Sequence, residues 1–340
     1  MKILKYLAIV LALVDAVLIG FLVHSAVFAK ETMPTSNVVP TYNSNTITYN
    51  DDTMSRVSSA KATYSSDDSY LTQRWGVSKI EAPQAWQIAK GNQPIIVAVL
   101  DTGIDMDNQD LTDKLVAEVN FTDSAASYDI YGHGTHMAGT IAAIAPECQL
   151  INVKVADDAG KCQASVVAEG IIWAVDQGAE VINISLCMEP SPALEEAVNY
   201  AWSRGAIIVA AAGNKGKSKP AYPAYYANCL AVAGTDENDS LALLSNHGDW
   251  VDVAAPGFNI YSELPQNQYG YKSGTSSAVA HASGVAALVF SVAEDTNGNG
   301  AINDEARQAI ENSCSPIGAD GVGKGRINAL EAVTKTISSN

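Results

Sequence analysis

In the middle of the chain, segments whose hydrophobic residues follow one another as in buried strands alternate with segments whose hydrophobic residues are spaced as in helices. Residues 95–100 form a continuous apolar run that predicts a strand buried on both faces, and residues 150–155, 181–185 and 206–211 are predicted as further strands. Residues 164–177 and 193–204 instead have helical spacing, and Gly178 ends the first of these segments. Strands that alternate with helices predict an α/β fold with a doubly wound, mostly parallel sheet flanked by helices.

Three further helices are predicted outside this alternation. Residues 82–89 place Pro83 in a first helical turn, where its missing N–H has no cost. The other two helices are rich in small residues, which allow close packing; one runs from Gly132 to Ile144, and the other carries Ser276 in its first turn and continues to Ser291.

The N-terminal part of the chain differs in composition from the rest. Residues 1–29 begin with Lys2 and Lys5 and continue as an apolar run, which predicts a signal peptide cleaved before Lys30. The run is also long enough for a retained membrane anchor, although Asp15 interrupts it. Either form places the rest of the chain outside the cytoplasm, so we expect a secreted or extracytoplasmic protein, membrane-anchored only if residues 6–29 are retained.

The remaining chain divides into two parts. Residues 30–66 are rich in Ser, Thr, Asn and Tyr without periodicity, which predicts a disordered linker or short pro-segment. Residues 67–340 are predicted to form a single α/β domain. The net charge of −17 argues against nucleic acid and anionic membrane surfaces as partners. The five cysteines are an odd number for an exported protein, so at least one is free or pairs between chains.

Four polar residues stand where predicted strands end or predicted helices begin. Asp101 follows the strand at 95–100, His133 begins a helix, Asn214 lies just past the strand at 206–211, and Ser276 lies in a first helical turn. Polar residues at the carboxyl ends of parallel strands and near helix N-termini lie where α/β sheets place their sites. Each has an ordinary structural interpretation alone: a turn aspartate, a structural histidine, a loop asparagine, a helix cap.

Metal binding is the main alternative for the histidine motif, because His133 and His136 lie three residues apart. No third ligand cluster accompanies the pair, so we discount a metal-dependent hydrolase.

The four motifs Asp101-Thr-Gly, His133-Gly-Thr-His, Ala-Ala-Gly-Asn214 and Gly-Thr-Ser276 occur in the order Asp, His, Asn, Ser. In this order and spacing the chain resembles the subtilisin-like serine proteases, most closely those of the thermitase type. The resemblance covers about residues 67–333 and includes Val251-Asp-Val-Ala-Ala-Pro-Gly257.

The resemblance implies a monomeric, secreted serine endopeptidase that acts on polypeptides and needs no cofactor for catalysis. Ser276 would be the nucleophile, His133 the general base and Asp101 its orienting carboxylate, with Asn214 in the oxyanion hole. The substrate would be flanked by Ser185, Leu186, Ala211, Ala212 and Gly213, and its first pocket would be apolar, formed by Ala211, Ala212, Gly213 and Ala221.

Some positions depart from the family pattern. Ser277 replaces a methionine, Ala280 a proline, and Cys187-Met188 the glycines beside the substrate groove. These departures keep open the alternative of a catalytically decayed binding or scaffold protein with the same fold.

The family's usual calcium loop is predicted to be absent, because only Ile144 and Ala145 separate Ala143 from Pro146, where the family carries a longer loop. Another candidate for structural calcium carries Asp295, Asn297 and Asn299 at alternating positions, as in EF-hand and dockerin loops. Ala306 stands at the usual twelfth-position acid, so Asp304 or Glu305 would have to substitute. A polar turn between helices is the alternative interpretation.

Overall fold

A computed structural model describes residues 73–89 and 94–339 of the chain. The predicted targeting segment and linker, residues 1–66, lie outside this range. None of the helices in the described residues has the length and apolar character that a membrane span requires.

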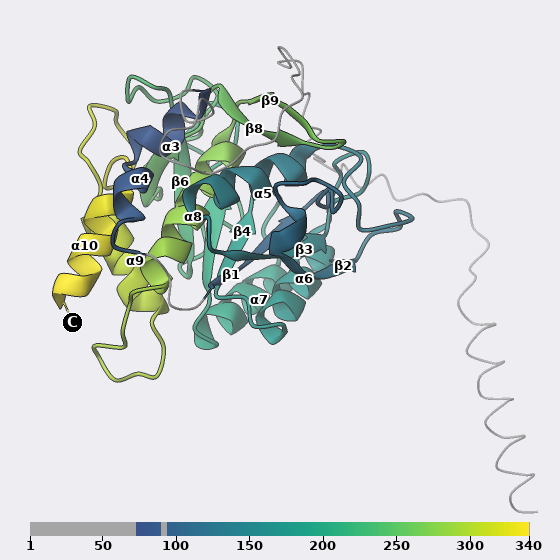
Figure 1. Cartoon of the computed structure of the whole chain (residues 1–340), viewed down its shortest axis with the longest axis horizontal. Coiled ribbons are helices and arrows are strands. Elements are labelled where there is room, and N and C mark those ends of the chain that lie inside the picture. The colour runs from purple at the N-terminus through teal and green to yellow at the C-terminus, as the bar shows by residue number, and fades with distance from the viewer. Residues whose placement is uncertain (1–72, 90–93, 340) are drawn as a thin grey trace, which may run out of the picture. The chain divides into compact units, whose positions relative to one another are not determined.

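The core of the fold is a seven-stranded sheet in the order β2-β3-β1-β4-β5-β6-β7 (Figure 1). All neighbouring strands pair in parallel, as the alternating pattern predicted. The strands span β1 Ile96–Asp101, β2 Leu115–Asn120, β3 Gln149–Lys154, β4 Val181–Ile184, β5 Ile207–Ala211, β6 Cys229–Thr235 and β7 Val253–Pro256.

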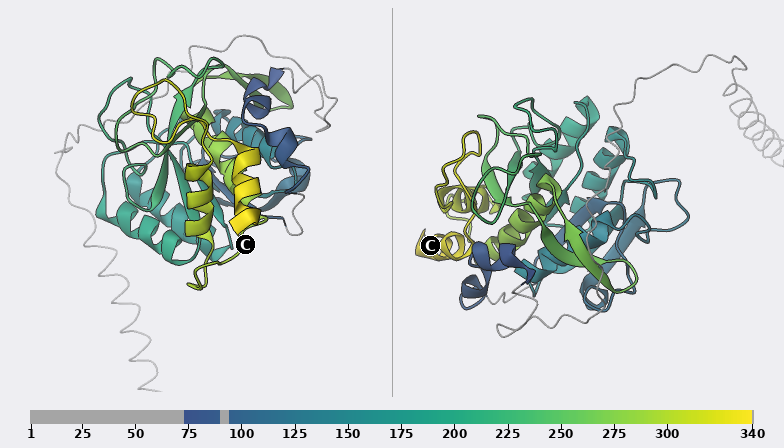
Figure 2. Two further views of the ribbon diagram at one scale, coloured as in Figure 1. Left: turned by 90° about the vertical axis from the view of Figure 1, so that its left-hand side faces the viewer. Right: turned by 90° about the horizontal axis from the view of Figure 1, so that it is seen from above.

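Helices cover both faces of this sheet (Figures 1 and 2). Successive residues of β1 point to opposite sides: Val97 and Val99 join one apolar core, and Ala98 and Leu100 join the other. The first core contains residues of α5 (His133–Ile144), α8 (Thr275–Phe290), α9 (Asn303–Asn312) and α10 (Ala329–Ser339). The second contains residues of α6 (Ala164–Asp176) and α7 (Pro192–Ser203).

The small-residue helices α5 and α8 are buried along their whole length. They approach closely at Gly284, where an added Cβ would lie 2.7 Å from Cβ of Ile144, so only glycine fits without displacement. With alanine at 280, α8 runs unbroken from Thr275 to Phe290. The predicted helix at 82–89 is shorter: α4 spans Ala82–Ala85 and a turn follows.

The strand order reverses direction at β1. β3 lies on one side of β1 and β4 on the other, so the chain leaves the carboxyl end of β1 at a topological switch point. Crevices at such points are where open α/β sheets bind ligands. Asp101 is the last residue of β1 and therefore lies at this point.

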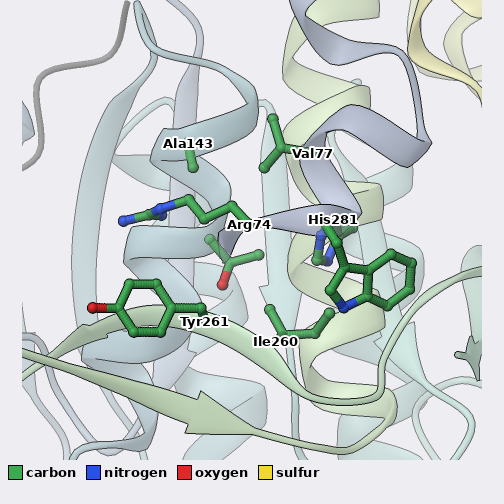
Figure 3. A pocket seen from close by; sticks show the side chains of 9 residues that line it. Arg74, Val77, Ala143, Ile260, Tyr261 and His281 are labelled. Atoms are coloured by element: carbon green, nitrogen blue, oxygen red, sulfur yellow. The ribbon is translucent and has the colours of Figure 1, made fainter. Parts of the chain in front are cut away.

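An antiparallel hairpin of β8 (Ile260–Leu264) and β9 (Gln268–Lys272) packs on α5. Short helix α3 (Trp75–Lys79) precedes the sheet, and just before it Arg74 makes a buried ion pair of 2.7 Å with Glu263 of β8. Burial opposes ionisation of Glu263, but the Arg74 guanidinium outweighs it and lowers the pKa of this carboxyl. Figure 3 shows Arg74 lying in a small cavity between Ala143 of α5, Tyr261 of β8 and His281 of α8. This pair ties the first described residues to the helices and hairpin that surround the site.

Candidate active site

The candidate site begins with a buried pair at the end of β1. Nδ1 of His133, the first residue of α5, lies 2.7 Å from Oδ1 of Asp101. The backbone N–H of Thr102 donates to the same oxygen at 2.8 Å. A ring whose Nδ1–H donates to a carboxylate presents Nε2 as its proton acceptor. The pair is thus arranged to hold an imidazole in the tautomer that a general base requires.

Asp129 fixes the start of α5, and the sequence analysis did not single it out. Its Oδ1 accepts hydrogen bonds from Thr102 Oγ1 and Gly132 N, both at 2.8 Å. Its Oδ2 accepts from the N–H and hydroxyl of Thr135 at 2.8 and 2.7 Å. Such a buried carboxylate satisfies the first N–H groups of a helix and complements its dipole. An aspartate four residues before the histidine motif was the available signal.

Lys154 is a second residue that the sequence analysis missed. It is fully buried at the end of β3, in register with Asp101. Its ammonium donates to the carbonyls of Thr102 and Tyr128 and pairs with Asp158 at 2.9 Å. These contacts join the segments that follow β1 and precede α5, so they support the position of the Asp101–His133 pair. A lysine that ends a buried apolar strand was the signal.

Ser276 is the second residue of α8 and lies at the same edge of the sheet. Its hydroxyl donates to the carbonyl of Ser185 at 3.1 Å, and the Ser185 hydroxyl donates to the carbonyl of Ser276 at 3.1 Å. Ser185 directly follows β4, which pairs with β1 so that Ile184 lies opposite Leu100. The register therefore brings Ser276 to the strand end beside Asp101.

Asn214 holds the turn that precedes Ser276. Its Oδ1 accepts hydrogen bonds from the N–H and the hydroxyl of Thr275, both at 2.9 Å. With the oxygen engaged in this way, the amide Nδ2 is left as a donor. A Cβ on Gly274 would lie 3.0 Å from that nitrogen, so glycine leaves the space beside it open. Nδ2 is thus available to a group bound next to Ser276.

The predicted substrate-flanking residues lie at the carboxyl ends of β4 and β5. Ser185, Leu186, Ala211 and Ala212 are buried, and the carbonyl of Ala211 accepts from the Cys187 thiol at 3.4 Å. Beside them lies a hollow lined by Gly213 and Ala221 of the four predicted pocket residues, and by Cys187 and Met188, which were expected beside the substrate groove. Lys215, Lys217 and Lys219 also line it and were not predicted.

His136 does not join His133. Its Nε2 faces the carbonyls of Ile260 and Gly270 at 3.0 and 3.3 Å, in the hairpin. Burial, with Lys272 and His133 nearby, lowers its pKa well below the ordinary value. Across residues 73–89 and 94–339, no group of three or more His, Cys, Asp or Glu side chains is arranged to hold a metal ion.

None of the five cysteines forms a disulfide. Burial raises the pKa of Cys148 to about 12 and of Cys162 to about 11, which disfavours the reactive thiolate.

The loop at residues 295–305 is exposed at residues 295–300, and hydrogen bonds from its own side chains hold its conformation. Oδ1 and Oδ2 of Asp295 accept backbone hydrogen bonds from Gly298, Asn299 and Gly300 at 2.7 to 3.2 Å. The amides of Asn297 and Asn299 both donate to Asp304 Oδ2, at 2.8 and 3.1 Å. Asp304 Oδ1 and Glu305 Oε2 are buried atoms without a hydrogen-bond partner. The loop thus gathers carboxylate and amide oxygens, two of them unsatisfied.

Comparison with known proteins gives concordant matches. Residues 92–330 match the profile described as Subtilase family. The chain is 44% identical to thermitase from Thermoactinomyces vulgaris, over 79% of this chain and 99% of that protein. It is 40% identical to subtilisin Savinase from Lederbergia lenta, over 77% and 98%. A solved protease structure from Pseudoalteromonas arctica shares 27% identity and a TM-score of 0.73, covering 79% of this chain and 99% of that one.

Proposed function

Because the chain belongs to the subtilase family, it is a serine endopeptidase, and we propose that Asp101, His133 and Ser276 form its catalytic triad. The observation that carries the assignment is the 2.7 Å pair of His133 and Asp101 at the strand end that also meets Ser276.

The proposed reaction divides into two acyl-transfer steps. Ser276 Oγ bonds to the scissile carbonyl carbon while its proton passes to His133 Nε2. The carbon–nitrogen bond then breaks, and the same proton goes to the departing amine. Water repeats the sequence on the acyl-enzyme and frees the carboxylate product. Asp101 keeps Nδ1 protonated and stabilises the imidazolium that forms in each step.

Asn214 is proposed to stabilise the tetrahedral oxyanion together with the Ser276 backbone N–H. Two features support this role: Thr275 holds the asparagine amide by its oxygen, and the first turn of α8 provides the positive end of a helix dipole. Nδ2 can then donate where negative charge develops.

The proposed substrates are polypeptides in extended form. Main-chain hydrogen bonds to the segments beginning at Ser185 and Ala211 would hold them by strand addition. Support comes from the family relationship and from the position of both segments at strand ends beside Ser276. The decayed-scaffold alternative is not favoured, because all four positions are occupied by the residues that the reaction needs.

The test is hydrolysis of casein by the full chain, beside the variant Ser276→Ala, with a fluorophosphonate probe on both. We expect cleavage and labelling that disappear together in the variant, because both require the Ser276 hydroxyl. Cleavage retained by a folded Ser276→Ala protein would refute the assignment of the nucleophile.

Calcium is proposed as a structural ion at the loop 295–305. The ligand atoms suit a hard cation, because Asp295, Asn297, Asn299 and Asp304 all offer oxygens. In addition, Asp304 Oδ1 and Glu305 Oε2 are buried without a hydrogen-bond partner. A bound ion would hold the connection between α8 and α9. Calorimetric titration should show calcium binding to the full chain and loss of it in Asp295→Ala; identical binding by both proteins would exclude the loop.

The protein is further proposed to be exported as a monomer, with residues 67–340 as its peptidase domain. Support comes from the sequence pattern of residues 1–29 and from the family match, which falls within that domain. Mass spectrometry of the secreted protein, to find its first residue, tests whether the N-terminal segment is removed.

A further inference from the structure

The hollow beside Asn214, described above, is positively charged, which is unusual in this acidic protein. Three lysines, at 215, 217 and 219, line it within a five-residue stretch, in a chain whose net charge is −17. All three are exposed, and none forms an ion pair within the described residues. Glu189 is the only acid among the lining residues. The hollow is therefore cationic although the protein is strongly acidic.

The hollow is also placed to receive one particular substrate side chain. The scissile carbonyl must lie between Ser276 Oγ and Asn214 Nδ2 for the proposed reaction to occur. In the substrate residue that contributes this carbonyl, Cα is bonded to the carbonyl carbon, and the hollow begins close by, at Gly213 and Asn214. The side chain of that substrate residue can therefore enter the hollow while Ser276 attacks the carbonyl.

The walls and the charges together suit a side chain with an apolar stem and a negative end. Met188, Pro220 and Ala221 offer apolar surface, and Lys215, Lys217 and Lys219 supply the positive charge. Glutamate has two methylene groups and a carboxylate, whereas aspartate has a shorter stem. We propose that this lysine-lined hollow gives the protease a preference for substrates with an acidic residue, glutamate above all, on the carbonyl side of the cleaved bond. This inference rests on the proposed triad and names the substrate class that the same site selects.

The test compares peptides that differ only at that residue, carrying Glu, Gln, Leu or Lys, with the full chain. Active enzyme is counted by fluorophosphonate labelling, so that kcat/KM refers to competent sites. We expect Glu to exceed its isostere Gln about fivefold, because a few exposed charge pairs contribute about 1 kcal/mol together. The preference should weaken with added salt, since exposed charges are screened over about 10 Å at 0.1 M.

Variants assign the effect to the lysines. Replacing Lys215, Lys217 and Lys219 together by Gln should bring the Glu-to-Gln ratio near one. A double Gln variant at the exposed Lys161 and Lys324, which do not line the hollow, should keep the wild-type ratio. Glu189→Gln should raise the ratio, because it removes the opposing charge.

The outcomes separate two failures. Labelled, active enzyme that cleaves the Gln, Leu or Lys peptide as well as the Glu peptide would overturn the acidic preference and leave the triad intact. A folded protein that neither labels nor cleaves any peptide would overturn the triad, and the preference with it. A ratio that survives in the triple variant would show that the lysines are not its source.

Discussion

The N-termini of α5 and α8 meet the same structural need with different electrostatics. Both helices follow a glycine that provides no side-chain cap, Gly132 in one and Gly274 in the other. A residue outside the helix supplies the acceptor in each case: the carboxylate of the nearby Asp129 for α5, and the amide oxygen of Asn214, far away in the chain, for α8. One cap is charged and the other is neutral.

The difference corresponds to the charge that each helix start must tolerate. His133 becomes cationic during the proposed reaction, so the charge of a buried carboxylate near the start of its helix does not oppose the reaction. An oxyanion forms beside Ser276, and a carboxylate there would oppose it, whereas an amide satisfies Thr275 and still offers Nδ2. A cap can thus be chosen for the chemistry of its site as well as for stability.

The largest expected effect comes from making the two caps alike. Asn214→Asp keeps an acceptor for Thr275 but removes the Nδ2 donor and adds a negative charge beside the oxyanion. We expect kcat to fall more than in Asn214→Ala, for which about 10²–10³-fold is the magnitude taken from subtilisin's oxyanion asparagine. The measurement is kcat on a neutral peptide at labelled-site concentration. Equal activity of Asn214→Asp and wild type would contradict the proposed role.

Weakening the charged cap should act mainly on stability. Asp129→Asn keeps one acceptor oxygen but replaces the other by an NH₂ group. That group cannot accept the hydrogen bonds that the backbone N–H of Gly132 or of Thr135 now donates to Asp129. Leaving buried donors unpaired should lower the free energy of unfolding by about 2–4 kcal/mol. Urea denaturation of the active-site variant Ser276→Ala, with and without Asp129→Asn, measures this without self-digestion. A loss below about 0.5 kcal/mol would mean that Asp129 does not hold the start of α5.

A histidine in α8 contrasts with the paired His133 of α5 and predicts a pH effect. His281 is buried, its Nδ1 lies 2.8 Å from the Ser277 carbonyl, and burial lowers its pKa to about 4. The unfolded chain binds this proton below about 6.5, so stability should fall as pH decreases from about 6.5 to 4, by up to about 3 kcal/mol. Comparing wild type with His281→Gln over this range should show a shallower decline in the variant. Parallel profiles would exclude His281 as the source.

The smallest expected effect concerns oxidation next to the nucleophile. Ser277 carries no thioether, so peroxide has no methionine to convert to the sulfoxide at that position. We expect Ser277→Met to lose activity in peroxide several times faster than wild type. Residual activity over time, with labelled sites counted in parallel, measures the difference. Rapid loss in the wild type would indicate another sensitive group.

Sequence patterns were most informative where the local chain carries the physical signal. The uninterrupted apolar runs predicted β1 and β5, because a strand buried on both faces is largely apolar. β3 and β4 were also predicted, although Asn152, Lys154 and Asn183 interrupt their apolar residues. Asp101 and His133 could be placed together because strand ends and helix starts meet at one edge of such a sheet. The helix at 82–89 was overextended, because local pattern locates helix ends poorly.

Although β2, β6, β7 and the β8–β9 hairpin were not predicted, the chain by itself thus indicated the α/β class, the alternation of β1, β3, β4 and β5 with helices, and the residues proposed for catalysis. Tertiary structure alone decided which side chains support them: Asp129 caps a helix from outside it, Lys154 is buried among carbonyls, and His136 turns into the hairpin. It also gathered the lysines of one loop at the hollow beside Asn214. The contacts of Lys154 and His136 join segments far apart in the chain, and such contacts leave no periodic trace in the residues that make them.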